Sequence, residues 1–493
     1  MQSTVVTPSE KRTLWSVITA SSVGTLIEWY DFYIFGTLAV TISTQFFPSE
    51  HPTAAFLSTL AAFAVGFIVR PFGALVFGRL GDMIGRKYTF LLTLIIMGSS
   101  TFLIGLVPSY DTIGIASPFI VVMLRLLQGL ALGGEYGGAA TYVAEHSPAA
   151  KRGFYTSFIQ TTASLGLFVS LAVILLVRLN MSEEAFESWG WRLPFLFSIF
   201  LVGISIYIRL RMKESPLFAK LKASGKISRN PIRESFGKKE NLKFVLIALF
   251  GATAGQGVVW YTGQFYALSF IQTTCNIEYV QAYHILAVAL LFGTPLFIYF
   301  GWLSDKIGRK SIMMAGLLFA VLLYRPIYQR MYALADTSAK TVVTETNNQD
   351  AQGAAVRTLL YADGSALKAT TVAGTVEEEV TLGNSAFWSM VLLIFIQVVL
   401  VTMVYGPIAA FLVELFPTRI RYTSMSLPYH IGNGVFGGLT PLIAASLYEA
   451  SRVSNPPDGD PYVGLLYPIG VAAVTLVVGM IFLSNKRRAD VTD

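Results

Sequence analysis

The chain has 493 residues, of which 54% are hydrophobic and 13% are charged, whereas about 25% of the residues of a typical soluble domain are charged. The hydrophobic residues form long runs rather than amphipathic stripes, which excludes an ordinary soluble fold and predicts membrane spans of about 20 residues each. A single cysteine, Cys275, excludes an intrachain disulfide and a cysteine metal cluster, and we expect no metal site. The first residues lack the apolar core of a cleavable signal peptide.

Twelve apolar runs follow one another along the chain, and each is long enough for one span. Every backbone donor and acceptor in hydrocarbon must be satisfied within its span, so the spans are predicted to be helices. They lie near residues 17–43, 54–77, 88–107, 117–143, 154–177, 192–210, 243–271, 280–300, 311–330, 386–412, 423–448 and 462–484. The predicted fold class is therefore all-α integral membrane, with 12 transmembrane helices.

Lysine and arginine gather on alternate connections between these spans. The loops 44–53, 108–116 and 272–279 contain neither residue, whereas the loops on the other side are basic. By the positive-inside rule, the N- and C-termini are both cytoplasmic. The net charge of +7 is explained by this topology, so we expect no nucleic-acid partner.

The same pattern divides the chain into two halves. We expect a cytoplasmic tail at 1–16, a six-helix half at 17–210, a basic cytoplasmic linker at 211–242, a second six-helix half at 243–484 and a cytoplasmic tail at 485–493. The linker either binds anionic lipid head groups or is a solvated connection between the halves. An outward insertion is expected at 331–385, where Asp363-Gly364 fits the turn of a short hairpin. The insertion is either a lid or partner-docking element or a tolerated, mobile loop, and the loop is the default.

An internal repeat supports the two halves. G-R-L-G-D-M-I-G-R-K at 78–87 matches G-W-L-S-D-K-I-G-R-K at 301–310, 223 residues later, and the pattern E-x-x-P-x-x-x-R occurs at 145–152 and again at 414–421, 269 residues later. The longer second offset places the extra chain in the second half. The halves are thus six-helix pseudo-repeats in parallel duplication, an arrangement typical of secondary transporters.

The two G-x-x-x-D-x-x-G-R-K loops resemble the signature of the major facilitator superfamily, and the resemblance covers nearly the whole chain. E-W-Y-D-F at 28–32, G-F-I-V-R-P-F-G at 66–73, R-L-L-Q-G-L-A-L-G-G-E-Y-G-G-A at 125–139, W-G-W-R-L-P-F at 189–195 and K-E-S-P-L-F at 213–218 resemble its metabolite:proton symporter family, which includes 2-oxoglutarate, shikimate, citrate and proline/betaine carriers. The insertion departs from the compact members.

The resemblance implies a proton-coupled symporter that takes up a small organic metabolite by alternating access in the bacterial cytoplasmic (inner) membrane. It implies a small-molecule substrate, surrounding membrane lipid, a monomer, and no cofactor besides the coupling proton. It also implies a gating role for the paired motifs. The simpler interpretation is that their basic residues only fix the orientation of the spans in the membrane, as topology anchors. The residues concerned are Gly78, Asp82, Gly85, Arg86 and Lys87, and their counterparts Gly301, Asp305, Gly308, Arg309 and Lys310. The same two interpretations apply to a pairing of the acid and arginine within each E-x-x-P-x-x-x-R pattern, Glu145 with Arg152 and Glu414 with Arg421.

Few ionisable residues lie inside the spans, where a charge costs at least about 2.5–3.5 kcal/mol. The main ones are Glu28, Asp31, Arg70, Arg125 and Glu135, with His284 and His430 expected to be satisfied interior groups. Their depths allow an Asp31–Arg125 pair and an Arg70–Glu135 pair. On one interpretation Glu28 or Asp31 carries the coupling proton and an arginine binds an organic carboxylate through two hydrogen bonds. On the other, these are structural pairs.

Aromatic residues accompany the two acids and are echoed in the seventh span. The candidates are Trp29, Tyr30, Tyr33, Trp260, Tyr261 and Gln264. They either form the wall of a cavity, including a cation–π cage for a quaternary ammonium, or pack the interior.

Other function classes fit the sequence less well. The fifth span lacks the proline expected of a proton antiporter that exports drugs, and no signalling domain accompanies the spans as in a sensor. HExxH, GxSxG and Walker motifs are absent, so we do not expect an enzyme.

Overall fold

The computed structural model describes residues 8–47, 58–59, 61–62, 65–211, 213–349, 355–372, 375–454 and 459–485. The N-terminal half contains α1 (Pro8–Thr37), α2 (Ala39–Phe46), α4 (Arg70–Met83), α5 (Arg86–Leu106), α6 (Tyr110–Ile113), α7 (Ala116–His146), η1 (Ala149–Lys151), α8 (Arg152–Gln160), α9 (Thr162–Leu179), α10 (Glu183–Ala185), η2 (Phe186–Gly190) and α11 (Arg192–Leu210). The linker forms α12 (Pro216–Ala223) and α13 (Pro231–Gly237).

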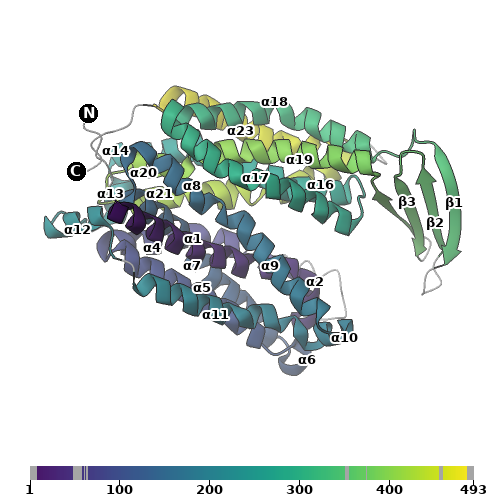
Figure 1. Cartoon of the computed structure of the whole chain (residues 1–493), viewed down its shortest axis with the longest axis horizontal. Coiled ribbons are helices and arrows are strands. Elements are labelled where there is room, and N and C mark those ends of the chain that lie inside the picture. Colours follow the sequence, from purple (N-terminus) through teal and green to yellow (C-terminus); the bar gives the residue numbers. More distant parts are fainter. Residues whose placement is uncertain are drawn as a thin grey trace.

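The C-terminal half is also helical, apart from its insertion. It contains α14 (Lys239–Ala248), η3 (Leu249–Thr253), α15 (Ala254–Tyr261), η4 (Thr262–Tyr266), α16 (Ala267–Thr273), α17 (Tyr279–Ile307), α18 (Arg309–Ala335), α19 (Asn384–Tyr405), α20 (Ile408–Leu415), α21 (Arg421–His430), η5 (Ile431–Gly437), α22 (Thr440–Ser454), η6 (Val463–Leu465) and α23 (Leu466–Phe482). Figure 1 shows the two halves as bundles lying side by side, purple to blue and green to yellow.

Nine helices within the described residues are long and apolar enough to cross a membrane. They correspond to nine of the twelve expected spans. The other three expected spans coincide with α1 and α2, with α4, and with α21, η5 and α22. α4 begins only at Arg70, after a turn at Val69, and α1 and α21 carry many of the polar side chains of the site below.

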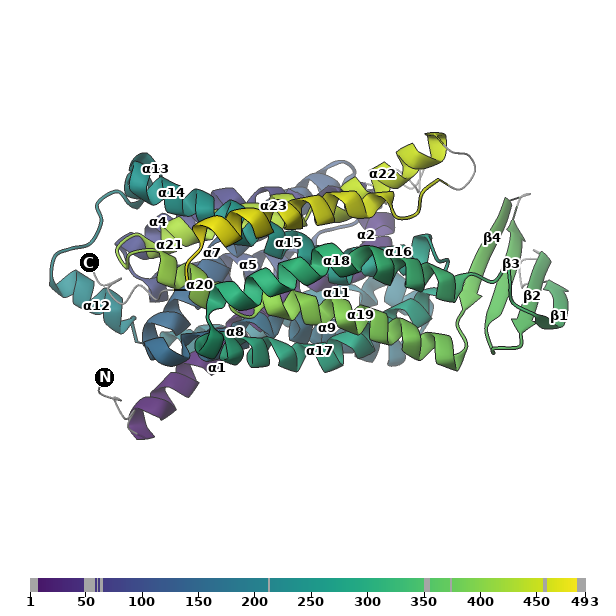
Figure 2. The ribbon, with the colours of Figure 1, turned by 90° about the horizontal axis from the view of Figure 1, so that it is seen from above.

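The ends of the bundle differ. The start of α1, the end of α23 and the linker helices lie at one end, together with the loops 78–87 and 301–310, and the strands lie at the opposite end (Figures 1 and 2). We call the first the motif end. The start and the end of the helical bundle therefore lie at the same end, as an even number of spans requires.

The insertion is a folded sheet. Strands β1 (Val342–Gln349), β2 (Ala355–Tyr361), β3 (Ala366–Val372) and β4 (Thr375–Thr381) pair antiparallel in chain order. The hairpin expected at Asp363-Gly364 is confirmed, with Gly364 at φ 79° between β2 and β3. The expectation of a mobile loop is wrong, since runs of threonine and valine suit strands. The insertion begins later than the expected residue 331, because α18 continues to Ala335.

Main-chain hydrogen bonds attach the sheet to the C-terminal half. Val380 N donates to the Asn276 carbonyl over 2.7 Å, and Glu278 N donates to the Val380 carbonyl over 2.9 Å. At the β2–β3 turn, burial raises the pKa of Asp363, but hydrogen bonds from Ser365 and the Lys340 ammonium outweigh it and lower the pKa to about 2. The sheet is thus positioned by fixed contacts.

Glycines let α4 and α7 approach closely. A Cβ added at Gly133 would lie 2.2 Å from the Arg70 carbonyl oxygen, and one at Gly73 would lie 1.9 Å from the Leu130 carbonyl oxygen. Both neighbours are backbone atoms, which cannot move away without shifting a helix. This contact fixes the depth of Arg70, which begins α4.

Gly133→Val is expected to lower the melting temperature of the purified protein, because the added atoms would force the helices apart at a cost of about 1–3 kcal/mol. Gly203→Val is the matched control, since a Cβ there meets nothing within 4 Å. Thermal unfolding followed by tryptophan fluorescence measures both variants. Equal melting temperatures would contradict the close packing of α4 against α7.

The two halves meet along two similar seams. α8 packs on α17, and α4 packs on α21. α20 also contacts α7 and α8. These seams bring each motif loop of one half against an E-x-x-P-x-x-x-R segment of the other.

Candidate functional site

A small cavity of about 30 Å³ lies between the two halves. From the N-terminal half it is lined by Thr25, Glu28, Trp29, Arg70, Leu132 and Tyr136. From the C-terminal half it is lined by Trp260, Tyr261, Tyr405, Tyr429, His430 and Asn433. We call it the central cavity. Its walls combine one arginine, one carboxylate and a ring of aromatic side chains.

Arg70 is the cation of this cavity. Its guanidinium carbon lies 4.2 Å from the ring centre of Phe67 and 4.9 Å from that of Phe32, and the residue is only 5% exposed. Nε and Nη2 have no hydrogen-bond partner among the described residues. Buried guanidinium groups are normally paired, so two unused donors beside a cavity suit a planar oxyanion.

Glu28 lines the same cavity, as the interpretation of a proton or substrate role requires. Its Oε1 has no hydrogen-bond partner among the described residues. Arg70 and Arg209 are its positively charged neighbours, and Glu135 and Asp31 are its negatively charged ones. No ion pair within 4.0 Å joins Glu28 to another described residue. The cavity therefore offers both signs of charge.

The expected Arg70–Glu135 pair is not formed. Glu135 instead accepts from Arg209 Nη2 over 2.6 Å and from Thr93 over 2.9 Å, away from the cavity lining. Arg209 lies in the last turn of α11, the sixth span, where a cation is usual, so no pattern in the sequence predicts that its side chain is buried beside Glu135. Gly24 makes the room, since a Cβ there would lie 2.0 Å from Arg209 Nη2.

The expected Asp31–Arg125 pair is also wrong. Asp31 is fully buried, and neither carboxylate oxygen has a hydrogen-bond partner among the described residues. The Thr101 hydroxyl lies beside it but donates to the Met97 carbonyl. Helical spacing placed Glu28 and Asp31 on one side of α1, yet only Glu28 lines the cavity.

Arg125 is held by aromatic rings and an amide. Its guanidinium carbon lies 4.3 Å from the ring centre of Phe35 and 5.3 Å from that of Phe32, and Nη1 donates to Gln128 over 2.8 Å. Gln128 in turn donates to Thr101 over 2.7 Å. Arg125 is thus connected to the surroundings of Asp31 through two polar side chains rather than by an ion pair.

The aromatic candidates divide into two groups. Trp29 and Trp260 meet across the halves with ring centres 5.7 Å apart, and Tyr261 contacts Phe67 at 6.0 Å. Tyr33 stacks on Trp29 at 5.6 Å. By contrast, the Tyr30 hydroxyl donates to the Pro194 carbonyl inside the N-terminal half, so this residue packs the interior.

Several lining residues were not predicted. Tyr136 and Tyr429 stack with ring centres 3.6 Å apart, Tyr429 bonds to the Tyr405 hydroxyl over 2.6 Å, and Asn433 exchanges two hydrogen bonds with Gln256. Gln264 is buried but is not in the lining. Such residues can be identified only when the packing of one half against the other is known.

His430, expected to be a satisfied interior group, is buried and has a hydrogen bond with the Gly133 backbone. It lies in the lining of the central cavity, and its Nε2 has no hydrogen-bond partner among the described residues. The C-terminal half therefore contributes a polar side chain opposite Arg70.

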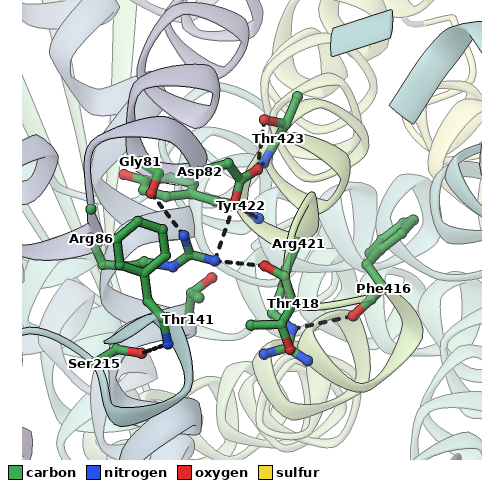
Figure 3. A network of polar contacts seen from close by, with 12 residues as sticks. Gly81, Asp82, Arg86, Thr141, Ser215, Phe416, Thr418, Arg421, Tyr422 and Thr423 are labelled. Carbon is green, nitrogen blue, oxygen red and sulfur yellow. Dashed lines mark hydrogen bonds and ion pairs between the residues drawn. The ribbon is translucent and has the colours of Figure 1, made fainter. Parts of the chain in front are cut away.

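The first motif loop makes a buried network at the motif end (Figure 3). Asp82 accepts hydrogen bonds from Tyr422 N over 3.3 Å and from Thr423 N and Oγ1 over 2.9 and 2.8 Å. Arg86 lies 3.1 Å from Asp82 and donates to the Thr418 carbonyl over 2.7 Å. Asp82 therefore caps α21 of the opposite half.

The second motif loop repeats this arrangement. Asp305 accepts from Gly153 N over 3.0 Å and from Phe154 N over 2.8 Å, and it pairs with Arg309 over 2.6 Å. Gly85 and Gly308, at φ 124° and 99°, make the turns before Arg86 and Arg309 as expected. The remaining motif members fit the same geometry, since Lys87 donates to Leu210 O, Lys310 donates to Met480 O, and Gly78 and Gly301 admit the facing helices.

The acids and arginines of the E-x-x-P-x-x-x-R patterns pair crosswise. Glu145 binds Arg421 over 2.8 Å, and Arg152 lies 3.4 Å from Glu414. The expected pairing of each acid with the arginine of its own segment is therefore wrong. Both pairs, like the contacts of Asp82 and Asp305, join one half to the other and hold the motif end closed.

The chain is similar to known transport proteins. Residues 16–243 match the family described as "Sugar (and other) transporter". The inner membrane metabolite transport protein YhjE of Escherichia coli (strain K12) is 33% identical over 87% of this chain and 87% of its own length. From the same organism, the shikimate transporter is 31% identical over 87% of this chain and 86% of its own, and the proline/betaine transporter 29% over 95% and 82%.

A solved structure shares the fold. The major facilitator superfamily proton:xylose symporter XylE, bound to 6-bromo-6-deoxy-D-glucose, superposes with a TM-score of 0.72 over 96% of this chain and 97% of its own, at 15% identity.

Proposed function

The chain belongs to the major facilitator superfamily of transporters, and we propose that it carries a small organic carboxylate together with a proton by alternating access. The family is one of multi-pass membrane transporters and not of enzymes. We place the motif end in the cytoplasm, which agrees with the basic residues there. We propose no cofactor besides the coupling proton, and a monomer as the working unit.

The unpartnered guanidinium of Arg70 carries this proposal. A carboxylate in the central cavity would accept from Nε and Nη2 in parallel, the geometry for which a guanidinium is suited. Phe32 and Phe67 hold the group in place through cation–π contacts, so little rotamer entropy remains to be lost on binding. The substrate would thereby satisfy donors that the protein leaves unused.

Asp31 is our candidate for the proton. An ionised carboxylate buried without a cation or a donor costs several kcal/mol, so the conformation closed at the motif end favours Asp31 in its protonated form. A symporter that loads from outside needs its proton bound in that conformation. Glu28 has Arg70 and Arg209 as cationic neighbours, and we assign it to the charge balance of the central cavity.

The two motif networks act as the cytoplasmic gate in this proposal. Asp82 and Asp305 each cap a helix of the opposite half, and such contacts have to break for the substrate to leave on that side. The crosswise pairs Glu145–Arg421 and Arg152–Glu414 break in the same movement. Topology anchors would not need bonds between the halves.

Asp82→Asn is expected to open the gate. An amide cannot replace both the ionic contact with Arg86 and all three bonds accepted from α21, and losing charged hydrogen bonds costs about 1.5–3 kcal/mol. The share of molecules open to the cytoplasm should then rise about tenfold or more.

A cysteine at Ser426, which is buried beside Gly137, reports the opening in a Cys275→Ser background. Inside-out vesicles are treated with a membrane-impermeant maleimide, and the labelling rate is compared between Asp82→Asn and the parent. Asp336→Asn, an acid on the sheet side, is the control. Equal labelling rates in the parent, Asp82→Asn and Asp336→Asn would show that Asp82 does not hold the gate closed.

The substrate class is tested by thermal shift on the purified protein with monocarboxylates, dicarboxylates, shikimate-like acids and betaines. Carboxylates without a positive charge should raise the melting temperature, and Arg70→Gln should abolish the shift. If neutral sugars stabilise the protein and carboxylates do not, the carboxylate proposal is wrong.

A zwitterionic osmolyte such as proline or betaine is the second candidate. Glu28 and the Trp29–Trp260 pair lie in the same cavity as Arg70, so a cationic group and a carboxylate on one small molecule would both find partners. Stabilisation by betaines alone, lost in Trp260→Leu, would favour this candidate over an organic acid.

A further inference from the structure

The two seams of the cytoplasmic gate have the same main-chain contacts. The residue that follows each E-x-x-P-x-x-x-R pattern is Gly153 in the N-terminal half and Tyr422 in the C-terminal half. Gly153 N donates to Asp305 over 3.0 Å, and Tyr422 N donates to Asp82 over 3.3 Å. A glycine therefore makes this contact as well as a tyrosine does, so the Tyr422 side chain is not needed for it.

The side chains at these two positions make the seams different. Gly153 of α8 lies directly against the main chain of α17, since a Cβ added at Gly153 would lie 2.5 Å from the Gly301 carbonyl oxygen. At the seam between α4 and α21, the Tyr422 side chain is fully buried and extends from α21 toward Gly81 of α4 (Figure 3). One seam is thus closed by main chain against main chain, and the other by an inserted ring.

Three glycines of the N-terminal half make room for this ring. A Cβ added at Gly81 would overlap ring carbon Cδ1, one at Gly137 would lie 2.9 Å from Cε2, and one at Gly138 would lie 2.6 Å from the hydroxyl oxygen. An alanine at any of these positions would therefore push against the ring. We call Gly81, Gly137 and Gly138 the Tyr422 socket.

The socket also binds the tyrosine hydroxyl. Tyr422 Oη donates a hydrogen bond to the Gly134 carbonyl, inside α7. On an α-helix the side chain four residues later lies over such a carbonyl, and here that residue is Gly138. The glycine leaves the carbonyl open, so the socket fits a phenol better than a purely apolar ring.

Tyr422 lies between the first motif network and the central cavity. It is the second residue of α21, and its N–H group belongs to the network. Ser426 follows one helical turn deeper, and Tyr429, which lines the central cavity, lies about 10 Å deeper than Tyr422. The ring in its socket therefore occupies the route along α21 from the cytoplasm to the cavity.

We propose that Tyr422 is the plug of the cytoplasmic gate. In the closed gate its ring fills the socket and separates the central cavity from the cytoplasm. The ring leaves the socket when α4 and α21 move apart, whereas the seam of α8 and α17 has a glycine at the equivalent position and opens without withdrawing a ring there. This role rests on the proposed function, because it requires alternating access, but it holds for any substrate.

Tyr422→Ala is expected to make the closed gate leak. The test uses the Ser426→Cys reporter in the Cys275→Ser background, with a membrane-impermeant maleimide on inside-out vesicles and no substrate present. Tyr422→Ala empties the socket and should raise the labelling rate at least about tenfold. Tyr422→Phe keeps the ring and loses one neutral hydrogen bond, so its rate should rise by no more than about fivefold. An unchanged rate in Tyr422→Ala would overturn the plug.

Gly81→Ala tests the socket from the other half. The added carbon would overlap the Tyr422 ring, so the labelling rate should rise although alanine is a better helix former than glycine. Combined with Tyr422→Ala it should add nothing, because the ring is already gone. If the two effects multiply instead, Gly81 does not act through Tyr422 and the socket is wrong. Gly81→Ala also decides the matter if Tyr422→Ala does not fold.

Tyr142→Ala is the matched control. Tyr142 is also buried and lies at the motif end, but it packs inside the N-terminal half, and its hydroxyl donates to the Lys213 carbonyl. Its loss should leave the labelling rate near that of the parent. A rise in Tyr142→Ala or in Tyr422→Phe as large as that in Tyr422→Ala would overturn the plug, since the ring in the socket would then not be what seals the gate. Labelling needs no substrate, so the plug result holds or fails separately from the thermal shifts that test the carboxylate.

Discussion

Arg70→Gln is expected to abolish concentrative uptake of the substrate carboxylate, and Arg70→Lys is expected to raise its apparent KM about 10- to 150-fold. A charge-assisted hydrogen bond contributes about 1.5–3 kcal/mol, and each 1.4 kcal/mol is a factor of ten in affinity. Lysine keeps the charge but loses the two parallel donors and the flat face that lies over Phe67. Uptake into reconstituted vesicles with an inward proton gradient measures both variants.

Arg192→Gln is the matched control for this substitution. Arg192 also lies in the N-terminal half, but it donates to the carbonyls of Gly105 and Val107, outside the central cavity. Its loss should reduce stability and leave KM near that of the parent. If Arg70→Gln folds and transports with an unchanged KM, Arg70 does not bind the substrate.

The fold follows from the sequence because hydrophobic runs and positive charge are one-dimensional signals. Each motif loop is similarly self-contained, since the glycine turn, the aspartate and the arginine lie within ten residues, and the Asp305–Arg309 contact spans a single helical turn. Such features need no knowledge of the partner half. The same holds for the β2–β3 hairpin, because two adjacent residues, Asp363-Gly364, are enough to predict its turn.

Contacts between helices could not be derived in the same way. Depth in the membrane allowed Arg70 to meet Glu135, but it did not reveal that Gly24 leaves space for Arg209, whose guanidinium takes the acid instead. Depth in the membrane and position around the helix also do not reveal which half a side chain faces. The sequence therefore favours pairing Glu145 and Glu414 with the arginines of their own segments, whereas each acid pairs with the arginine of the other segment. Tyr429, near the end of α21, lines the cavity beside Tyr136 of the other half, on which it stacks, and no pattern within its own segment predicts that contact.

The two acids of α1 are expected to have different roles, with Asp31 carrying the coupling proton and Glu28 contributing to the substrate cavity. Asp31→Asn should abolish accumulation driven by a proton gradient, while substrate binding and exchange of internal for external substrate continue. Asparagine resembles the protonated form of Asp31, so the cycle proceeds without the step in which the proton leaves. Because Asp31 has no described partner to lose, the substitution should cost little stability.

Glu28→Gln is the contrasting variant, since Glu28 lines the cavity beside Arg70 and Asp31 does not. It should keep proton-driven accumulation and alter the relative affinities for zwitterions and simple acids, because the negative charge of the central cavity is gone. Internal pH followed with a fluorescent dye on substrate addition, together with labelled-substrate exchange, separates the two results. If proton-driven accumulation survives in Asp31→Asn but fails in Glu28→Gln, Glu28 and not Asp31 carries the coupling proton. Glu28 would then be both the acid of the central cavity and the proton carrier. The coupling proton and a positively charged group of the substrate would compete for its carboxylate.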